Sequence, residues 1–118
     1  MDRRVQIIIS SLQEDLRREM ILDELAHSLN LSRSRLQHLF KSETGLPPAQ
    51  YLRRLRLERA KDLMRNSVLS VKQVMTSVGI SDKSHFERAF KKAYGLTPRQ
   101  YRMSHLALSL GKGTGNGR

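Results

Sequence analysis

Apolar positions recur along most of the chain at the three- and four-residue spacing of one buried helix face. The first stripe follows Asp2, a good N-cap residue, and predicts a helix that packs on the next segment through Val5, Ile8, Ile9, Leu12 and Leu16. Further stripes predict helices over about residues 22–29, 33–43, 48–65, 71–78, 83–93 and 97–106. The pattern therefore predicts an all-α protein.

Two stretches of the chain resemble each other at an offset of 49 residues, which becomes 50 after a turn. The first contains LAHSLNLS, LQHLFK and GLPPAQY, and the second contains VMTSVGIS, FERAFK and GLTPRQY. Each copy predicts a short helix, a tight turn and a second helix, which is the sequence form of a helix-turn-helix. A duplicated helical hairpin has the same periodicity, so the outward face must decide between the two.

The residues at the turns agree with this interpretation. Asn30 and Gly79 end the first helix of each copy, and both residue types tolerate a positive φ. Ser32 is the predicted N-cap of the second helix in the first copy, and Ser81 or Asp82 has that role in the second.

The outward positions of the second helix in each copy carry polar side chains. In the first copy they are Arg33, Ser34, Arg35, Gln37, His38 and Lys41, and in the second they are Lys83, Ser84, His85, Glu87, Arg88 and Lys91. Such groups suit the donors and acceptors on base edges, and the flanking cations suit phosphate. A face selected only for solubility is more often rich in Glu and Lys, so both copies favour DNA reading.

The charge is strongly positive and unevenly placed. The chain has 118 residues and a formal net charge of +11. Residues 1–24 carry a net charge of −2, and residues 25–118 carry +13. The positive electrostatic field of residues 25–118 attracts polyanions, and nucleic acid is the usual polyanionic partner of a basic domain. An anionic membrane surface is the alternative partner. Charge that only solubilises the chain is the third interpretation.

The predicted helix between the copies begins at Pro47 or Pro48 and carries many arginines. Eighteen residues span about 27 Å, and one turn of B-DNA is about 34–36 Å. A stiff connector of this length suits two reading helices in successive major-groove segments and an asymmetric site. Arg54 and Arg56 are phosphate candidates here, with solvated surface charge as an equal alternative.

The sequence predicts four segments: a first subdomain over 1–46, a linker helix over 47–66, a second subdomain over 67–107 and a glycine-rich flexible tail over 108–118. The chain has no cysteine, which excludes thiol catalysis and cysteine-bound zinc. The four histidines, at 27, 38, 85 and 105, lack metal-ligand spacing. We therefore expect no enzyme activity, no metal, no cofactor, no signal peptide and no membrane span.

Several motifs together resemble the DNA-binding domain of the AraC/XylS family of bacterial transcription regulators. The most specific are VGISDKSHFERAFKK over residues 78–92 and GLTPRQYR over residues 95–102, and the first copy agrees with both. The resemblance covers residues 5–103. It implies a homeodomain-like fold of seven helices, in which two helix-turn-helix subdomains are joined by a long central helix.

The resemblance also implies a function. It implies sequence-specific binding of double-stranded DNA by a transcription regulator, most often an activator, in the bacterial cytoplasm and on the nucleoid. RNA polymerase is then a candidate partner, and oligomerisation would use a domain outside this chain. The base-reading positions that it implies are Ser34, Gln37, His38, Lys83, Ser84, His85, Glu87 and Arg88. The phosphate candidates remain Arg33, Arg35, Lys41, Arg54, Arg56 and Lys91.

Two positions depart from the family pattern. His38 stands where the family often has arginine, and an imidazole has no bidentate fork for guanine. Glu87 stands where the family often has a small polar residue. It either accepts from a cytosine amine or pairs with Lys83 or Lys91 one helical turn away, and we favour the local pair. These departures leave one alternative, a protein-interaction module of the same fold with lost or weak DNA binding.

Overall fold

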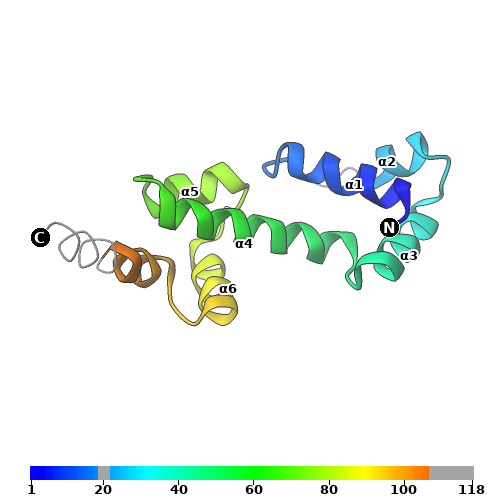
Figure 1. Cartoon of the computed structure of the whole chain (residues 1–118). Coiled ribbons are helices and arrows are strands. Elements are labelled where there is room, and N and C mark those ends of the chain that lie inside the picture. The colour runs from blue at the N-terminus through cyan, green and yellow to red at the C-terminus, as the bar shows by residue number, and fades with distance from the viewer. Residues whose placement is uncertain (19–21, 107–118) are drawn as a thin grey trace, which may run out of the picture. The chain divides into compact units, whose positions relative to one another are not determined.

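The structure, a computed structural model, describes residues 1–18 and 22–106. Its helices are α1 (Arg3–Glu14), α2 (Leu22–Ser28), α3 (Arg33–Thr44), α4 (Pro48–Asn66), α5 (Val71–Val78) and α6 (Lys83–Tyr94), followed by a closing helix over residues 98–106 (Figure 1). No strand occurs in these described ranges, and the predicted all-α fold class is confirmed. The predicted tail over 108–118 lies outside the described residues.

The chain divides into unit 1 (residues 1–56) and unit 2 (residues 57–118), and the boundary falls inside α4. The sequence predicts a linker helix over residues 47–66 between two subdomains. In the structure, α4 contributes buried residues to both units: Leu52 belongs to the core of unit 1, and Ala60 and Met64 belong to that of unit 2. One helix thus supplies buried residues to both cores, the last ones of unit 1 and the first ones of unit 2.

The core of unit 1 brings together α1, α2, α3 and the first half of α4. Its buried residues are Val5, Ile8, Leu12, Leu22, Leu25, Ala26, Leu36, Phe40 and Leu52. Leu16 does not extend the α1 stripe as predicted, because α1 ends at Glu14. Asp15 is extended there, and its carboxylate accepts a hydrogen bond from the Arg17 N–H at 3.0 Å, a local turn that competes with the helix. Leu16 packs against the core from beyond the helix end.

The start of α1 is capped and tied to α3. Asp2 is the N-cap, and its carboxylate accepts a hydrogen bond from the Arg4 N–H at 2.8 Å. Hydrogen bonds from the Arg4 side chain, and then from its backbone, hold the pKa of Asp2 below the usual 3.8. The Asp2 N–H donates to Glu43 Oε1 at 2.6 Å, which joins the start of unit 1 to the last turn of α3.

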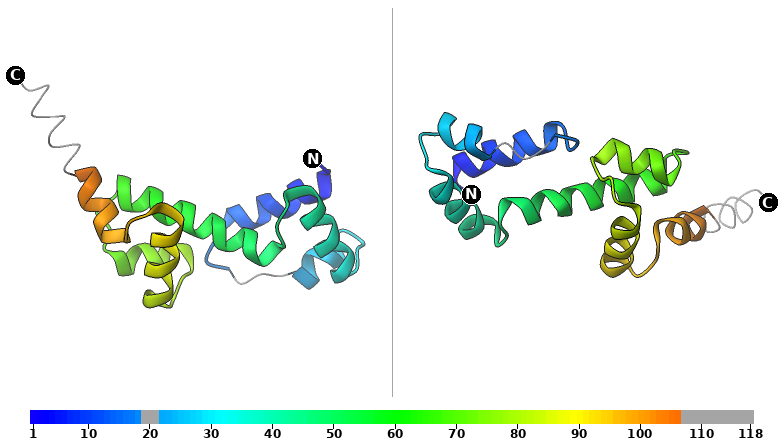
Figure 2. Two further views of the ribbon diagram at one scale, coloured as in Figure 1. Left: turned by 90° about the horizontal axis from the view of Figure 1, so that it is seen from below. Right: turned by 180° about the vertical axis from the view of Figure 1, so that it is seen from behind.

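The core of unit 2 repeats this plan around the second half of α4. Figures 1 and 2 show α5, α6 and the closing helix gathered around that half. Its buried residues are Ala60, Met64, Val74, Met75, Val78, Phe86 and Phe90. Ser70 caps α5 through a reciprocal pair of hydrogen bonds with Gln73, at 3.1 Å and 2.8 Å.

The same aromatic contact anchors the second helix of each copy. Phe40 and Tyr51 meet edge to face with ring centroids 5.2 Å apart, and Phe90 and Tyr101 do so at 5.6 Å. Both phenylalanines are fully buried. The sequence repeat is therefore also a repeat of packing.

The turns repeat as well, with one inserted residue. Asn30 has φ 56° and Gly79 has φ 80°, as their residue types predicted. Ser32 caps α3, but Asp82 rather than Ser81 caps α6, and its carboxylate accepts from the His85 N–H at 3.0 Å. The extra residue of the second copy thus lengthens the turn, and the residue directly before the helix is still an N-cap.

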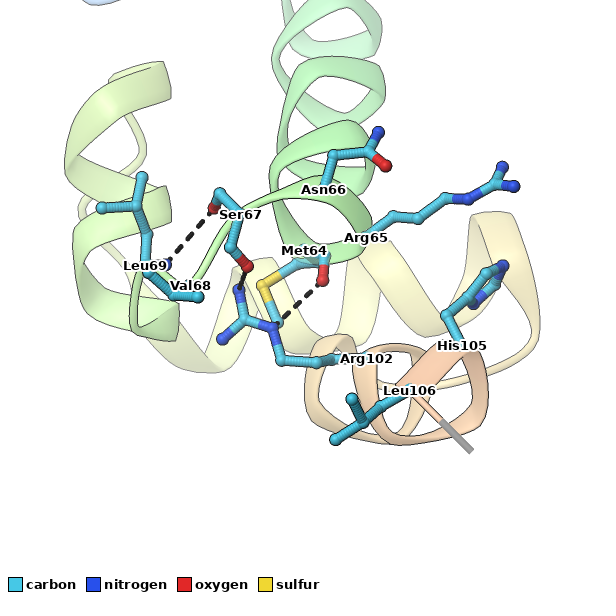
Figure 3. A pocket seen from close by; sticks show the side chains of 9 residues that line it. All are labelled: Met64, Arg65, Asn66, Ser67, Val68, Leu69, Arg102, His105 and Leu106. Carbon is cyan, nitrogen blue, oxygen red and sulfur yellow. Dashed lines mark hydrogen bonds between the residues drawn. The ribbon is translucent and has the colours of Figure 1, made fainter. Parts of the chain in front are cut away.

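An arginine on the closing helix holds the end of α4. The Nε of Arg102 donates to the carbonyl oxygen of Met64 at 3.0 Å, and a terminal nitrogen donates to that of Ser67 at 3.4 Å (Figure 3). The last carbonyls of a helix have no partner within the helix. Arg102 supplies one and so fixes the closing helix to the end of α4.

Gly45 allows a test of the connection between α3 and α4. It has φ 84°, and an added Cβ would meet nothing within 4 Å. We therefore expect Gly45→Ala to lower the free energy of unfolding by about 1–2 kcal/mol through backbone conformation alone. Urea unfolding followed by circular dichroism measures this. Gly45→Asn should cost less, because asparagine tolerates the left-handed region, and an equal loss would contradict the explanation.

Candidate nucleic-acid interface

The second helix of each copy, α3 and α6, is called a reading helix below, after the role that the sequence predicts for it. In α3, Leu36 and Phe40 are buried in the core and Leu39 packs against it, so the opposite side of the helix turns outward. Ser32 caps the helix, and its hydroxyl accepts from the Arg35 N–H at 3.1 Å. All six predicted side chains are exposed on this helix, namely Arg33, Ser34, Arg35, Gln37, His38 and Lys41. The structure brings them together on the outer side of α3.

The reading helix of unit 2 is built in the same way. Phe86 and Phe90 are buried, and the exposed side chains are Lys83, Ser84, His85, Arg88 and Lys91. Glu87, the sixth predicted side chain of this helix, is half-buried, whereas the other five are exposed. The Lys83 Nζ lies 3.9 Å from Glu87 Oε1, one turn away along α6. This is the local pair that the sequence analysis favoured over a contact with a cytosine amine.

An ion pair in unit 1 was not found by sequence reasoning. A terminal nitrogen of Arg33 lies 3.6 Å from Asp23 Oδ2, which belongs to α2. The sequence gives Asp23 no assigned role, because its partner lies beyond the turn and periodicity within one helix does not reveal such contacts. The fold of α2 against α3 brings the two together.

The arginines of α4 have different environments. Arg54 is exposed on α4. Arg56 is half-buried, and its Nε donates to the Leu16 carbonyl oxygen at 2.8 Å while a terminal nitrogen donates to that of Arg18 at 3.1 Å. The structure thus uses this guanidinium to hold the segment after α1. We therefore remove Arg56 from the predicted phosphate contacts.

Within residues 1–18 and 22–106, no group of three or more His, Asp or Glu side chains is arranged to hold a metal ion. In the same ranges, no helix has both the length and the apolar character that a membrane crossing needs. The exposed faces of α3 and α6 remain the strongest candidate site.

A short helix, a left-handed turn and a capped second helix with a polar outer face define the helix-turn-helix class, and this chain contains two. A family model described as a helix-turn-helix domain matches residues 25–104. The chain belongs to the AraC/XylS family of helix-turn-helix, DNA-binding transcription regulators, which is not an enzyme family. The predicted family is confirmed.

Three similar proteins illustrate this membership. The transcriptional activator RhaS of Escherichia coli (strain SE11) is 34% identical over 99 residues, covering 84% of this chain and 36% of RhaS. An AraC-type regulator from Chromobacterium violaceum has a TM-score of 0.78 at 27% identity, covering 86% of this chain and 91% of that one. The DNA-binding domain of AdpA, solved with a target DNA, has a TM-score of 0.80 at 25% identity, covering 90% and 96%. The chain spans about a third of the length of the curated relatives it matches.

The structural role of Arg56 is testable by substitution. Arg56→Met keeps the aliphatic stem and removes the hydrogen bonds to two carbonyl oxygens. We expect a loss of about 1–3 kcal/mol in the free energy of unfolding, because those carbonyls lose their partner. Arg53→Met is the matched control, since Arg53 is exposed on the same helix and its Nε donates to the carbonyl oxygen of Ala49, within that helix, at 3.5 Å. Equal stability of the two variants in urea would contradict the assignment.

Proposed function

We propose that this chain binds double-stranded DNA sequence-specifically by placing α3 and α6 in the major groove. The observation that carries the proposal is the repeated construction of the reading helices. In each, a buried phenylalanine fixes the inner face, and an N-cap residue satisfies the first turn. The outer face is left to exposed polar side chains. A helix of this kind fits the width of the major groove.

The exposed side chains suit direct base readout. Gln37 offers the amide pair that recognises adenine bidentately, and Arg88 offers the fork that recognises guanine. The remaining proposed base-reading residues are Ser34, His38, Lys83, Ser84, His85 and Glu87, each of which has a donor or an acceptor for a base edge. Glu87 would accept from a cytosine amine after its contact with Lys83 loosens.

Phosphate contacts would position these helices. We propose Arg33, Arg35, Lys41, Arg54 and Lys91 for this role, because cations beside a reading face bind the backbone without selecting sequence. All five are exposed.

The continuous α4 supports an asymmetric site. Its 19 residues give a length of about 28 Å. Two unlike reading helices on one chain require two unlike half-sites, so we propose a non-palindromic site covering two successive major-groove segments. Because RhaS is named a transcriptional activator and only 36% of it matches this chain, we propose that this chain is the C-terminal domain of a longer protein. That protein would activate transcription together with RNA polymerase, and any oligomerisation would use regions outside this chain.

The alternative is an interaction module of the same fold with weak DNA binding, and a salt titration separates the two. If six to ten phosphates are neutralised, affinity for duplex DNA should fall by about 10³–10⁵ between about 50 and 200 mM salt. Fluorescence anisotropy with a labelled duplex measures this. A flat response would favour the interaction module.

Base reading by each unit is testable on a site selected from random duplex DNA. Gln37→Ala and Arg88→Ala should each cost about 1–3 kcal/mol of binding free energy and relax one base position. The two relaxed positions should lie about 10 base pairs apart, one in each half-site. Gln6→Ala is the control, because Gln6 is an exposed glutamine that belongs to α1 and not to a reading helix. Equal losses on selected and random DNA would refute base reading by these two side chains.

A further inference from the structure

The first residue of each reading helix is a cation beside a carboxylate of its own unit. In unit 1, Arg33 lies 3.6 Å from Asp23 of α2. In unit 2, Lys83 lies 3.9 Å from Glu87 of the same helix. The two carboxylates come from different elements, and yet they approach the same position of the repeat. Within the described ranges, α6 carries no other acidic residue, and its one carboxylate is placed beside this cation.

Both pairs are exposed, and each includes the first residue of a helix that we propose to enter the major groove. The side chains of Arg33 and Asp23 are 59% and 77% exposed, and those of Lys83 and Glu87 are 68% and 41% exposed. Exposed pairs of this kind are weak, so they add little to folding. A cation in such a pair can exchange its carboxylate for a phosphate oxygen, because the two groups offer the same kind of acceptor.

We propose that Asp23 and Glu87 compete with DNA phosphate for the first cation of each reading helix. The proposal rests on the proposed DNA binding and adds two residues that weaken it. Arg33 and Lys83 contact phosphate only after leaving a carboxylate, and that carboxylate then remains beside a polyanion. The two acids therefore lower the affinity for a duplex that lacks the preferred sequence.

The competition matters most for DNA without the preferred sequence. Non-specific binding is almost entirely electrostatic, and it depends on how many phosphates the protein neutralises. A carboxylate released from its cation takes up a counterion, which offsets the counterion that leaves the DNA. Removing the carboxylate should therefore tighten non-specific binding. It should also steepen the slope of log affinity against log salt concentration by up to about one.

The test in unit 1 compares two neighbouring acids on α2. Asp23→Asn and Glu24→Gln each remove one negative charge from an exposed residue, and among the described residues only Asp23 pairs with Arg33. Affinity is measured for a random-sequence duplex at several salt concentrations. We expect Asp23→Asn to bind about two- to fivefold more tightly than wild type. Glu24→Gln should tighten binding by a clearly smaller factor, since it changes only the overall electrostatic field.

The gain must also depend on the cation. In an Arg33→Met background, Asp23→Asn should increase the affinity no more than Glu24→Gln does. In unit 2, Glu87→Gln should tighten binding by a similar factor, and that gain should disappear with Lys83→Met. Circular dichroism melting of each variant checks that the fold is unchanged, as expected for exposed pairs.

The outcomes separate this inference from the proposed function. Equal affinities of Asp23→Asn and Glu24→Gln, or gains that persist without Arg33 and Lys83, would overturn the competition while leaving DNA binding intact. A wild-type chain that binds duplex DNA without salt dependence would overturn the proposed function itself.

Discussion

Burial of one phenylalanine on each reading helix is the constraint on which the rest of the structure depends. Phe40 and Phe90 are fully buried, and each meets a tyrosine edge to face. In a helix of 3.6 residues per turn, fixing one inward position fixes the direction of every other side chain. Truncation of a buried phenylalanine typically costs about 3–5 kcal/mol, so this orientation is strongly held. The polar outer face of α3 or α6 is therefore a consequence of core packing.

The chain builds two cores from limited apolar material by using α4 twice. Leu52 completes the core of unit 1, and Ala60 and Met64 begin that of unit 2. Arginines support the arrangement at corresponding places. Arg56 of α4 holds the segment after α1, and Arg102 of the closing helix holds the end of α4. In each unit, an arginine on the last helix therefore binds carbonyl oxygens at or just after the end of the first helix.

Local rules predicted most of the fold, because helix periodicity, caps and turns depend on neighbouring residues. The stripes placed the described helices, and Asn30 and Gly79 adopt the positive φ that their residue types indicated. The early end of α1 was missed because the stripe ran on to Leu16, whereas Asp15 forms a turn with the next residues. For the candidate site, the exposed positions of α3 and α6 followed from the same periodicity. Arg56 and Asp23 did not, because their partners lie in other elements and only the fold brings them close.

These distant contacts change what the net charge means. A count of +11 treats every cation as available to a polyanion. The structure shows guanidinium groups bound to backbone carbonyls at Arg56 and Arg102, and cations beside carboxylates at Arg33 and Lys83. A carbonyl partner leaves the charge in place but fixes the side chain, whereas a carboxylate neutralises the charge locally. Interaction with nucleic acid therefore depends less on the total charge than on which cations the packing leaves on the outer faces of the reading helices.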